Sequence, residues 1–187
     1  MTMRTIAFVV CSFVAAGSAT AGADDGVAAT KTIAVDGGVA VPTGTWSDAA
    51  GIGIGALGRF EMPVAPNLAF SVRAGLVYHT SKDQSGGIFT GDTNVQMSEL
   101  PLLAGVRYDF APNFYGAAEL GFVVEMASVS FGGMSASSSQ TNLGSTLGVG
   151  YRAGKLDVRA GLFLPDLGHA GDLLGVMATV GYDVASL

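Results

Sequence analysis

The sequence is short of cysteine, of charge and of long apolar runs, and each shortage excludes a class of protein. Cys11 is the only cysteine in the 187 residues, so a disulfide framework is not available. Charged residues make up only 13% of the chain, against about a quarter to a third of a typical soluble surface. After residue 23, no apolar run reaches the roughly 18 to 20 residues that a transmembrane helix requires.

Positive charge is the scarcer sign. Nine Lys and Arg stand against fifteen Asp and Glu, which gives a formal net charge of −6. Nucleic-acid binding needs a basic patch, so no nucleic-acid partner is expected. The mean hydropathy is nevertheless +0.47. A hydrophobic chain without a spanning helix points to a β-barrel in a membrane.

Residues 1–23 have the pattern of a cleaved secretory signal peptide. Arg4 supplies the positive charge, IAFVVCSFVAA is a short apolar core that contains Cys11, and residues 19–21 (ATA) offer small side chains for cleavage. We therefore expect residues 24–187 to form the mature protein, as a single domain.

The remaining chain alternates between apolar and polar residues with a period of two, between breaks that contain Gly and Pro. Most of the predicted strands are long enough to cross a bilayer, for which a tilted strand needs about 9–11 residues. Eight strands are predicted, at residues 33–42, 51–62, 68–80, 96–109, 114–127, 142–153, 156–164 and 174–184.

The predicted links between strands alternate in length. Residues 63–67, 111–113 and 153–155 are tight turns, whereas 43–50, 81–95, the Ser-rich 128–141 and 165–173 are longer surface loops. Outer-membrane barrels place their short turns on the periplasmic side. An even number of strands would bring both termini to that same periplasmic side.

One face of these strands is apolar, and the other collects the charges. All four glutamates and five of the six arginines share the second face. A charge on the lipid face at mid-bilayer costs about 2–4 kcal/mol. We therefore expect the charged face to line the lumen as a network of ion pairs. Its glycines would leave room there for long side chains. The predicted network consists of Asp36, Arg59, Glu61, Arg73, Glu99, Arg107, Asp109, Glu119, Glu125, Arg152, Asp157, Arg159 and Asp183.

A soluble barrel with an apolar interior is the alternative, because its strands alternate in the same way. Such a protein would bind a ligand inside the barrel, as lipocalins do. The charged face carries no lysine within the predicted strands, unlike a hydrated surface. The apolar face is also too bulky to fill a small lumen. These two features favour the membrane barrel.

Three motifs carry a family resemblance: GGVAVPTG (37–44), LPLLAGVRYDF followed by YGAAELGF, and the final VMATVGYDV. They resemble small outer-membrane proteins of the OmpA/OmpX-like type. The resemblance implies an all-β, eight-stranded antiparallel up-and-down transmembrane β-barrel in a Gram-negative outer membrane. It also implies contact with outer-membrane lipids and lipopolysaccharide, and assembly by the barrel-assembly machinery. The chain ends in Ser186-Leu187, where such barrels usually carry an aromatic residue.

No catalytic group, cofactor or metal site is predicted. The two histidines, His79 and His169, lie on different segments and define no metal-ligand spacing. A less favoured alternative is a Ser-His-Glu set made of Ser81, His79 and Glu99, similar to the His-x-Ser of lipid A deacylase barrels. By strand parity His79 faces the lumen, where lipid has little access, so a protein that is not an enzyme is favoured.

The expected role is therefore structural or interactive: a monomeric barrel whose lumen is filled by charges and whose loops face the exterior. A narrow passive channel of the porin-like kind is the alternative, if the charges leave a path for water.

Overall fold

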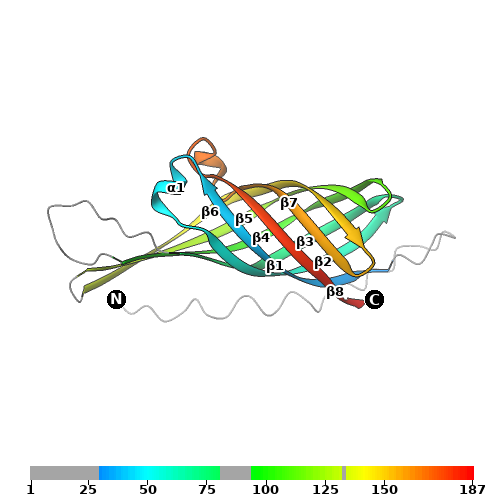
Figure 1. The fold of residues 1–187 in the computed structure, drawn as a ribbon, viewed down its shortest axis with the longest axis horizontal. Coiled ribbons are helices and arrows are strands. Elements are labelled where there is room, and N and C mark those ends of the chain that lie inside the picture. The colour runs from blue at the N-terminus through cyan, green and yellow to red at the C-terminus, as the bar shows by residue number, and fades with distance from the viewer. Residues whose placement is uncertain (1–29, 81–93, 132–133) are drawn as a thin grey trace.

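In the computed structural model the eight predicted strands close into one barrel (Figure 1). The structure describes residues 30–80, 94–131 and 134–187, so the predicted signal peptide and most of the link 81–95 lie outside the described residues. Every strand pairs antiparallel with its neighbours along the chain, and β1 pairs with β8 to close the circle. The strands are β1 (Thr32–Thr43), β2 (Gly53–Ala65), β3 (Leu68–His79), β4 (Asn94–Ala111), β5 (Phe114–Phe131), β6 (Met134–Ala153), β7 (Leu156–Leu164) and β8 (Leu174–Ser186).

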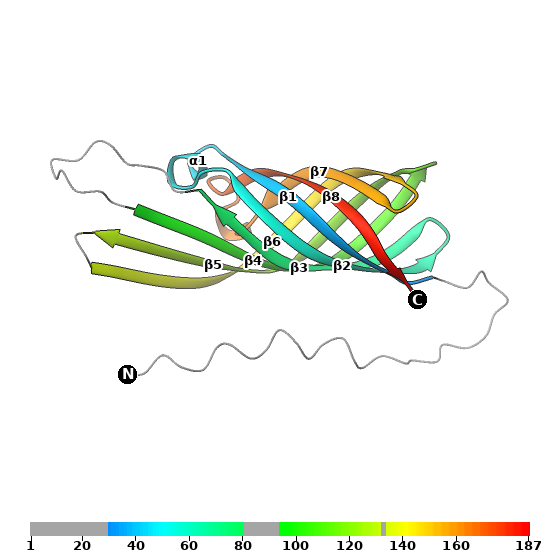
Figure 2. The ribbon, with the colours of Figure 1, turned by 60° about the horizontal axis from the view of Figure 1, so that its bottom comes forward.

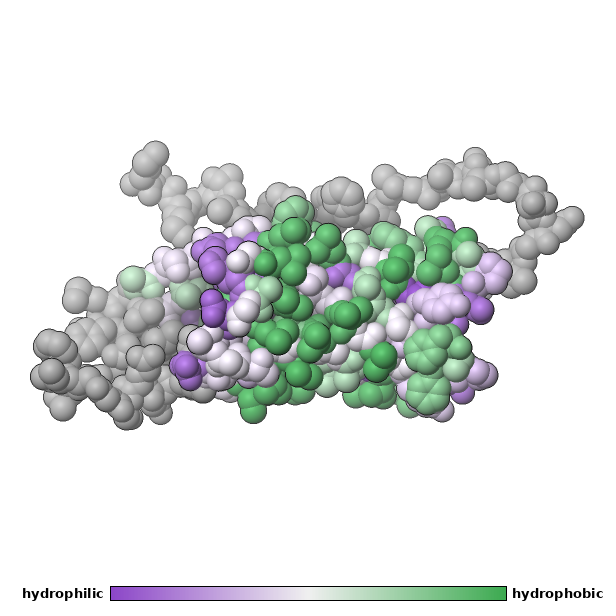
Figure 3. Space-filling model, turned by 90° about the horizontal axis from the view of Figure 1, so that it is seen from above, coloured by the Kyte–Doolittle hydropathy of each residue, from purple (hydrophilic) through white to green (hydrophobic). Residues whose placement is uncertain are grey.

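The alternation along each strand decides which side chains face outward. On β6, Leu147 and Val149 are 59% and 62% exposed, whereas Glu119 on β5 is 3% exposed. On the face shown in Figure 3, apolar residues gather across the middle of the barrel. The lipocalin-like alternative is therefore wrong, because the charged face lines the inside of this barrel and the apolar face covers the outside.

The tight turns fall where Asn and Gly break the alternation. Asn67 and Asn113 have φ values of 64° and 68°, and Gly154 has 60°. Asn and Gly adopt this left-handed conformation more readily than other residues. Both ends of the described chain lie at the same rim as these turns, where Lys31 and Leu187 exchange two backbone hydrogen bonds of 2.9 and 2.8 Å.

Three strands continue beyond the opposite rim as a sheet (Figure 2). The pairing of β5 with β6 extends to Phe131 and Met134, whereas β6 pairs with β7 only from Ser145 onward. The prediction of a Ser-rich loop at 128–141 is therefore wrong over most of its length. Small polar residues carry no strand signal of their own, and here the backbone pairing with β5 holds them extended.

The links at this loop rim contain short helical turns. Helix α1 (Trp46–Ala49) lies between β1 and β2, and the 3₁₀ turn η1 (Leu167–His169) lies between β7 and β8. The backbone of Trp46 donates to Asp172 O at 3.1 Å, which ties the two links together. Within the described part of the chain, no helix has the length and apolar character needed to span a membrane.

Candidate functional site

The inside of the barrel holds three groups of side chains, stacked from the turn rim to the loop rim. We call them the turn-side cluster, the central cluster and the loop-side layer. The turn-side cluster consists of Asp36, Arg59, Glu61, Arg107, Asp109, Tyr115, Arg152, Asp157 and Asp183. The central cluster consists of Ser71, Arg73, Glu119, Thr146 and Arg159. The loop-side layer consists of Trp46, Val77, His79, Glu99, Leu103, Val123 and Phe163.

Glu61 joins three arginines in the turn-side cluster. Its Oε1 accepts from Arg59 Nη1 at 2.7 Å. Its Oε2 accepts from Arg107 Nη1 at 2.6 Å and from Arg152 Nη2 at 2.8 Å. Glu61 is 5% exposed, so these bonds replace the water that a buried carboxylate loses.

Asp157 connects further members of the turn-side cluster. Its Oδ1 accepts from Tyr115 Oη at 2.6 Å, and its Oδ2 from Arg152 Nε at 3.0 Å. Arg59 lies between this carboxylate and two others, with Nε 3.2 Å from Asp36 Oδ2 and Nη2 3.6 Å from Asp183 Oδ1. Six strands contribute to these contacts, so the cluster connects opposite walls of the barrel.

Glu119 is the centre of the central cluster. Its Oε1 accepts from Ser71 Oγ at 3.1 Å and from Arg159 Nη1 at 2.9 Å. Its Oε2 accepts from Arg73 Nη1 at 3.3 Å and from Thr146 Oγ1 at 2.8 Å. The side chain of Glu119 has no solvent exposure. One buried carboxylate thus holds two arginines from opposite sides, with two hydroxyl groups completing its hydrogen bonds.

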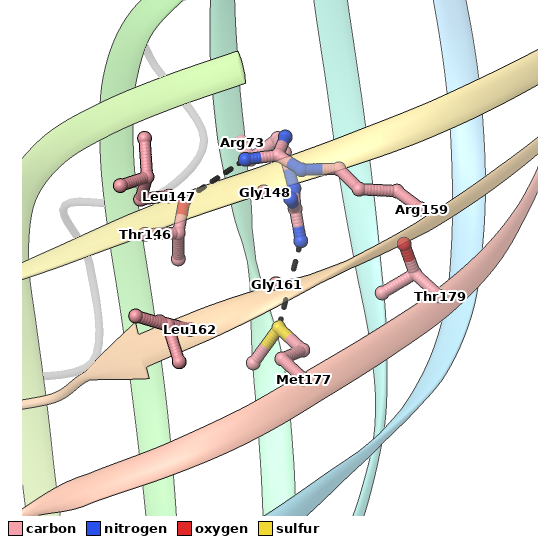
Figure 4. Close-up of a pocket in the computed structure, with 9 residues that line it drawn as sticks. All are labelled: Arg73, Thr146, Leu147, Gly148, Arg159, Gly161, Leu162, Met177 and Thr179. Atoms are coloured by element: carbon pink, nitrogen blue, oxygen red, sulfur yellow. Dashed lines mark hydrogen bonds between the residues drawn. The ribbon is translucent and has the colours of Figure 1, made fainter. Parts of the chain in front are cut away.

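Little space remains around the central cluster. The cavity in Figure 4, between Arg73, Arg159 and Met177, has a volume of about 10 Å³. Arg73 Nη2 reaches Met177 Sδ at 3.6 Å, and Arg159 Nη2 reaches Thr146 Oγ1 at 3.0 Å. A cavity of about this size holds a single water molecule. At this level the barrel is packed with side chains.

The loop-side layer is mainly apolar and is covered by the link between β1 and β2. Trp46 is 1% exposed, and its ring centroid lies 5.4 Å from that of His79 and 6.1 Å from that of Phe163. His79 Nε2 lies 3.3 Å from Glu99 Oε2, and His79 Nδ1 forms a hydrogen bond of 2.9 Å with Gly51 O. Trp46 therefore closes the interior at the loop rim.

The structure brings most of the predicted network residues together, but it separates two of them. Glu99 pairs with His79, and Glu125 lies opposite Glu99 in the β4–β5 register. No arginine forms an ion pair with either carboxylate in the part of the chain that the structure describes. The two glutamates share the parity of the network and not its location, because they lie nearer the loop rim than the arginines.

The structure also tests part of the Ser-His-Glu alternative. His79 and Glu99 lie in contact, but both side chains have no solvent exposure. Ser81 lies outside the described residues. The imidazole and the carboxylate are therefore both enclosed inside the barrel.

Several interior residues were not predicted as site residues. Tyr115 has the parity of the charged face, so its position could have been inferred from the alternation. Ser71 and Thr146 share this parity, and their hydroxyl groups complete the bonding of Glu119. Trp46 gives no such signal, because it lies in a link with no periodicity.

Two interior glycines make room for these side chains, as expected. A Cβ at Gly181 would collide with the Asp36 carboxylate and lie 3.0 Å from Arg59 Nη2. A Cβ at Gly150 would collide with the Tyr115 ring. At Gly105 the reason differs, since a Cβ there would meet the backbone of Ala118. That glycine allows two strands to approach closely.

Outside the barrel, Asp166 and His169 form an ion pair in the link between β7 and β8. His169 Nδ1 lies 2.7 Å from Asp166 Oδ2, and Asp166 Oδ1 accepts from Gly168 N at 2.7 Å. The hydrogen bond between the two side chains raises the pKa of His169 above 6.5 and lowers that of Asp166 below 3.8. Within the described residues, no cluster of three His, Cys, Asp or Glu is arranged to hold a metal ion.

We expect this link to be most stable at mildly acidic pH. The His169 contribution is complete below about pH 6.5 and is lost as the pH rises through its raised folded pKa, whereas the Asp166 contribution is lost on acidification. In an NMR titration His169 should titrate above 6.5, and in Asp166→Asn its pKa should return towards 6.5. His79 is the internal reference, since its signals should not respond to this substitution. An unchanged His169 pKa in the variant would contradict the pairing.

The closed barrel, apolar outside and charged inside, defines the class: an eight-stranded antiparallel barrel with the architecture of small outer-membrane proteins. No protein-family model and no curated protein matches the sequence. Among solved structures, the chain is similar to Ail, the attachment invasion locus protein of Yersinia pestis. The crystal structure of Ail gives a TM-score of 0.58 at 13% identity, covering 83% of this chain and 97% of that chain.

Two further structures of Ail give similar results. The complex with the heparin analogue sucrose octasulfate has a TM-score of 0.61 at 12% identity, covering 83% of this chain and 97% of that chain. The backbone structure of Ail in a phospholipid bilayer nanodisc has a TM-score of 0.50 at 14% identity, covering 81% and 98%. At these identities the similarity concerns the fold.

Proposed function

We propose that this chain is a monomeric outer-membrane barrel with a structural and surface-interaction role, and that it is not an enzyme. The apolar outward face suits a lipid environment with lipopolysaccharide in its outer leaflet, and the barrel-assembly machinery would insert the barrel. The tight turns and both termini would face the periplasm, since short turns lie on that side in barrels of this class. The sheet formed by β4, β5 and β6 would then extend outside the cell.

A closed lumen is part of this proposal. Trp46 covers the loop rim, the central cluster leaves about 10 Å³, and the turn-side cluster connects the walls. These three barriers in series argue against the passive channel. The burial of His79 and Glu99 argues in the same way against a lipid hydrolase.

The observation that carries the surface role is the open edge of β6. Residues 134–144 pair with β5 on one side, and their other side has no β7 partner, because that pairing begins at Ser145. Ala136, Ser138 and Gln140 are exposed. An edge with free N–H and C=O groups binds an extended segment of another protein as an additional strand. Charges and prolines block such edges, and residues 134–144 have neither.

The charge of the outer end restricts the partner. In the described segments 43–52, 94–100, 121–131, 134–144 and 165–173 there is no Lys or Arg, whereas Asp48 and Asp172 are exposed. A sulfated polysaccharide, like the heparin analogue bound to Ail, would find no basic side chain on these described segments. We therefore propose an uncharged or basic peptide strand as the partner.

The edge can be tested with a single charge. In Ser138→Lys we expect binding of a synthetic eight-residue peptide of alternating Thr and Val to fall by about tenfold, because a lysine blocks strand addition. The peptide is a neutral strand former, and its affinity for the protein in detergent micelles is measured by fluorescence anisotropy. The control Ala153→Lys places the same charge on β6 at the turn rim and should bind like the wild type. Equal affinities for all three proteins would refute the edge as the binding surface.

A further inference from the structure

An apolar groove crosses the outward face of the barrel from β4 to β8. Its volume is about 630 Å³. Tyr108 is the only lining residue with a polar side-chain atom. The lining consists of Val106, Tyr108, Gly116, Ala117, Ala118, Leu147, Gly148, Val149, Ala160, Gly161, Leu162 and Val176.

The groove follows the strand register. Val106 pairs with Ala118, Ala118 with Leu147, Leu147 with Leu162 and Leu162 with Val176. The outward residues of β5 in the groove are small, since Gly116 and Ala118 lie between the larger residues of β4 and β6. A Cβ built on Gly116 meets no atom within 4 Å. The hollow therefore results from missing side-chain volume on β5.

The course of the groove matches the depth of one leaflet. Four strand spacings of about 4.8 Å give a length of about 19 Å. Strands of such barrels tilt by about 35–45°, so a line across them climbs about 11–13 Å along the barrel axis. Half of the hydrocarbon core is about 15 Å. The groove begins at Tyr108, three residues before the end of β4 at Ala111, and so on the turn side.

The turn rim also offers a site for a head group. Phe114 and Tyr151 lie two residues from the lining residues Gly116 and Val149, towards the turn rim, and their ring centroids are 4.9 Å apart. Aromatic residues are enriched at the level of lipid head groups. Lys155 is exposed in the turn between β6 and β7. Its Nζ lies 5.9 Å from the Tyr182 ring centroid. A positive charge at this level attracts a lipid phosphate.

We infer that this groove binds one acyl chain of an anionic phospholipid from the leaflet on the turn side. The inference rests on the proposed membrane location, because only there does a phospholipid reach this face. The small residues on β5 admit the chain, and the phosphate lies near Lys155. A second copy of the protein is the competing occupant that the experiment must exclude.

The test is native mass spectrometry of the refolded protein in detergent with added dipalmitoyl phosphatidylglycerol. The wild type should retain one lipid per barrel, and Ala118→Leu, which fills the groove, should lose it. The control Ala104→Leu adds the same volume on β4, at an exposed outward position that does not line the groove. It should retain the lipid. Lys155→Gln should lower retention roughly fivefold.

Two results would overturn the inference: equal retention by Ala118→Leu and Ala104→Leu, or a protein dimer that only the groove variant loses. Folding is verified for each variant by the shift of its gel band on boiling. If Ala118→Leu does not fold, Gly116→Val takes its place. A wild-type protein that folds only without detergent or lipid would refute the membrane location itself, which is a separate failure.

Discussion

A Leu147→Arg variant should fail to accumulate as a folded barrel in the membrane. Leu147 lies on the outward face of β6, is 59% exposed and is surrounded by other apolar residues. An arginine at the bilayer midplane costs about 2–4 kcal/mol, which is a large share of the stability of a small domain. The measurement is the heat-shifted gel band in the outer-membrane fraction of expressing cells.

The matched control for this variant is Leu156→Arg. Leu156 is similarly exposed, at 52%, but it is the first residue of β7 at the turn rim. The cost of a charge falls to about 0–1 kcal/mol near the interface, so this variant should fold at close to the wild-type yield. Equal yields of the two variants would mean that the face we assign to lipid is not in the hydrocarbon core.

Replacing Glu119 by glutamine should lower the free energy of unfolding by about 3–5 kcal/mol. The substitution keeps the volume but leaves Arg73 and Arg159 buried without the carboxylate that pairs with both. Removing one partner of a buried ion pair has an effect of about this size. Urea unfolding in detergent can be followed by tryptophan fluorescence, because Trp46 is the only tryptophan and is buried.

Two further variants separate charge from packing at this position. In Glu119→Gln/Arg159→Met part of the stability should return, because removing both charges is less harmful than leaving one unpaired. Asp109→Asn should cost less than about 1 kcal/mol, since the Asp109 side chain is 39% exposed and, among the described residues, forms an ion pair only with Arg107. Equal losses for Glu119→Gln and Asp109→Asn would contradict the central cluster.

Stepwise conductance of the wild type in planar bilayers would contradict the closed lumen.

The alternation of residues was enough to predict the barrel and the direction in which its side chains point. The predicted strand 156–164 agrees with β7 at both ends, because apolar residues recur at every second position from Leu156 to Leu164. Strand 142–153 was predicted eight residues too short at its start, because Ser and Ala beyond the rim show no alternation. Pairing with β5 fixes that segment, and such pairing between strands is not visible in local sequence.

The interior could be predicted only as a set of residues. Parity places Arg73 and Glu119 on the inside, but it does not show that one carboxylate holds two arginines. That arrangement depends on the register, which brings together side chains from β3, β5 and β7. Trp46 depends on a link that folds back over the rim, and its position follows from contacts with His79 and Phe163.

The pairing of β1 with β8 has a consequence for how quickly the protein folds. The other seven strand pairs join neighbours along the chain, whereas Thr32 and Ser186 meet across about 150 residues. The entropy of closing a loop of that length costs about 4 kcal/mol beyond a constant term. Until the seam forms, both of its strands expose unpaired backbone groups, each costing several kcal/mol in hydrocarbon. An open sheet is therefore unstable in the membrane, so insertion must be coupled to the pairing of β1 with β8. This pairing is then the slow step of folding. Substitutions along β1 and β8 should then change the folding rate more than those within the hairpins.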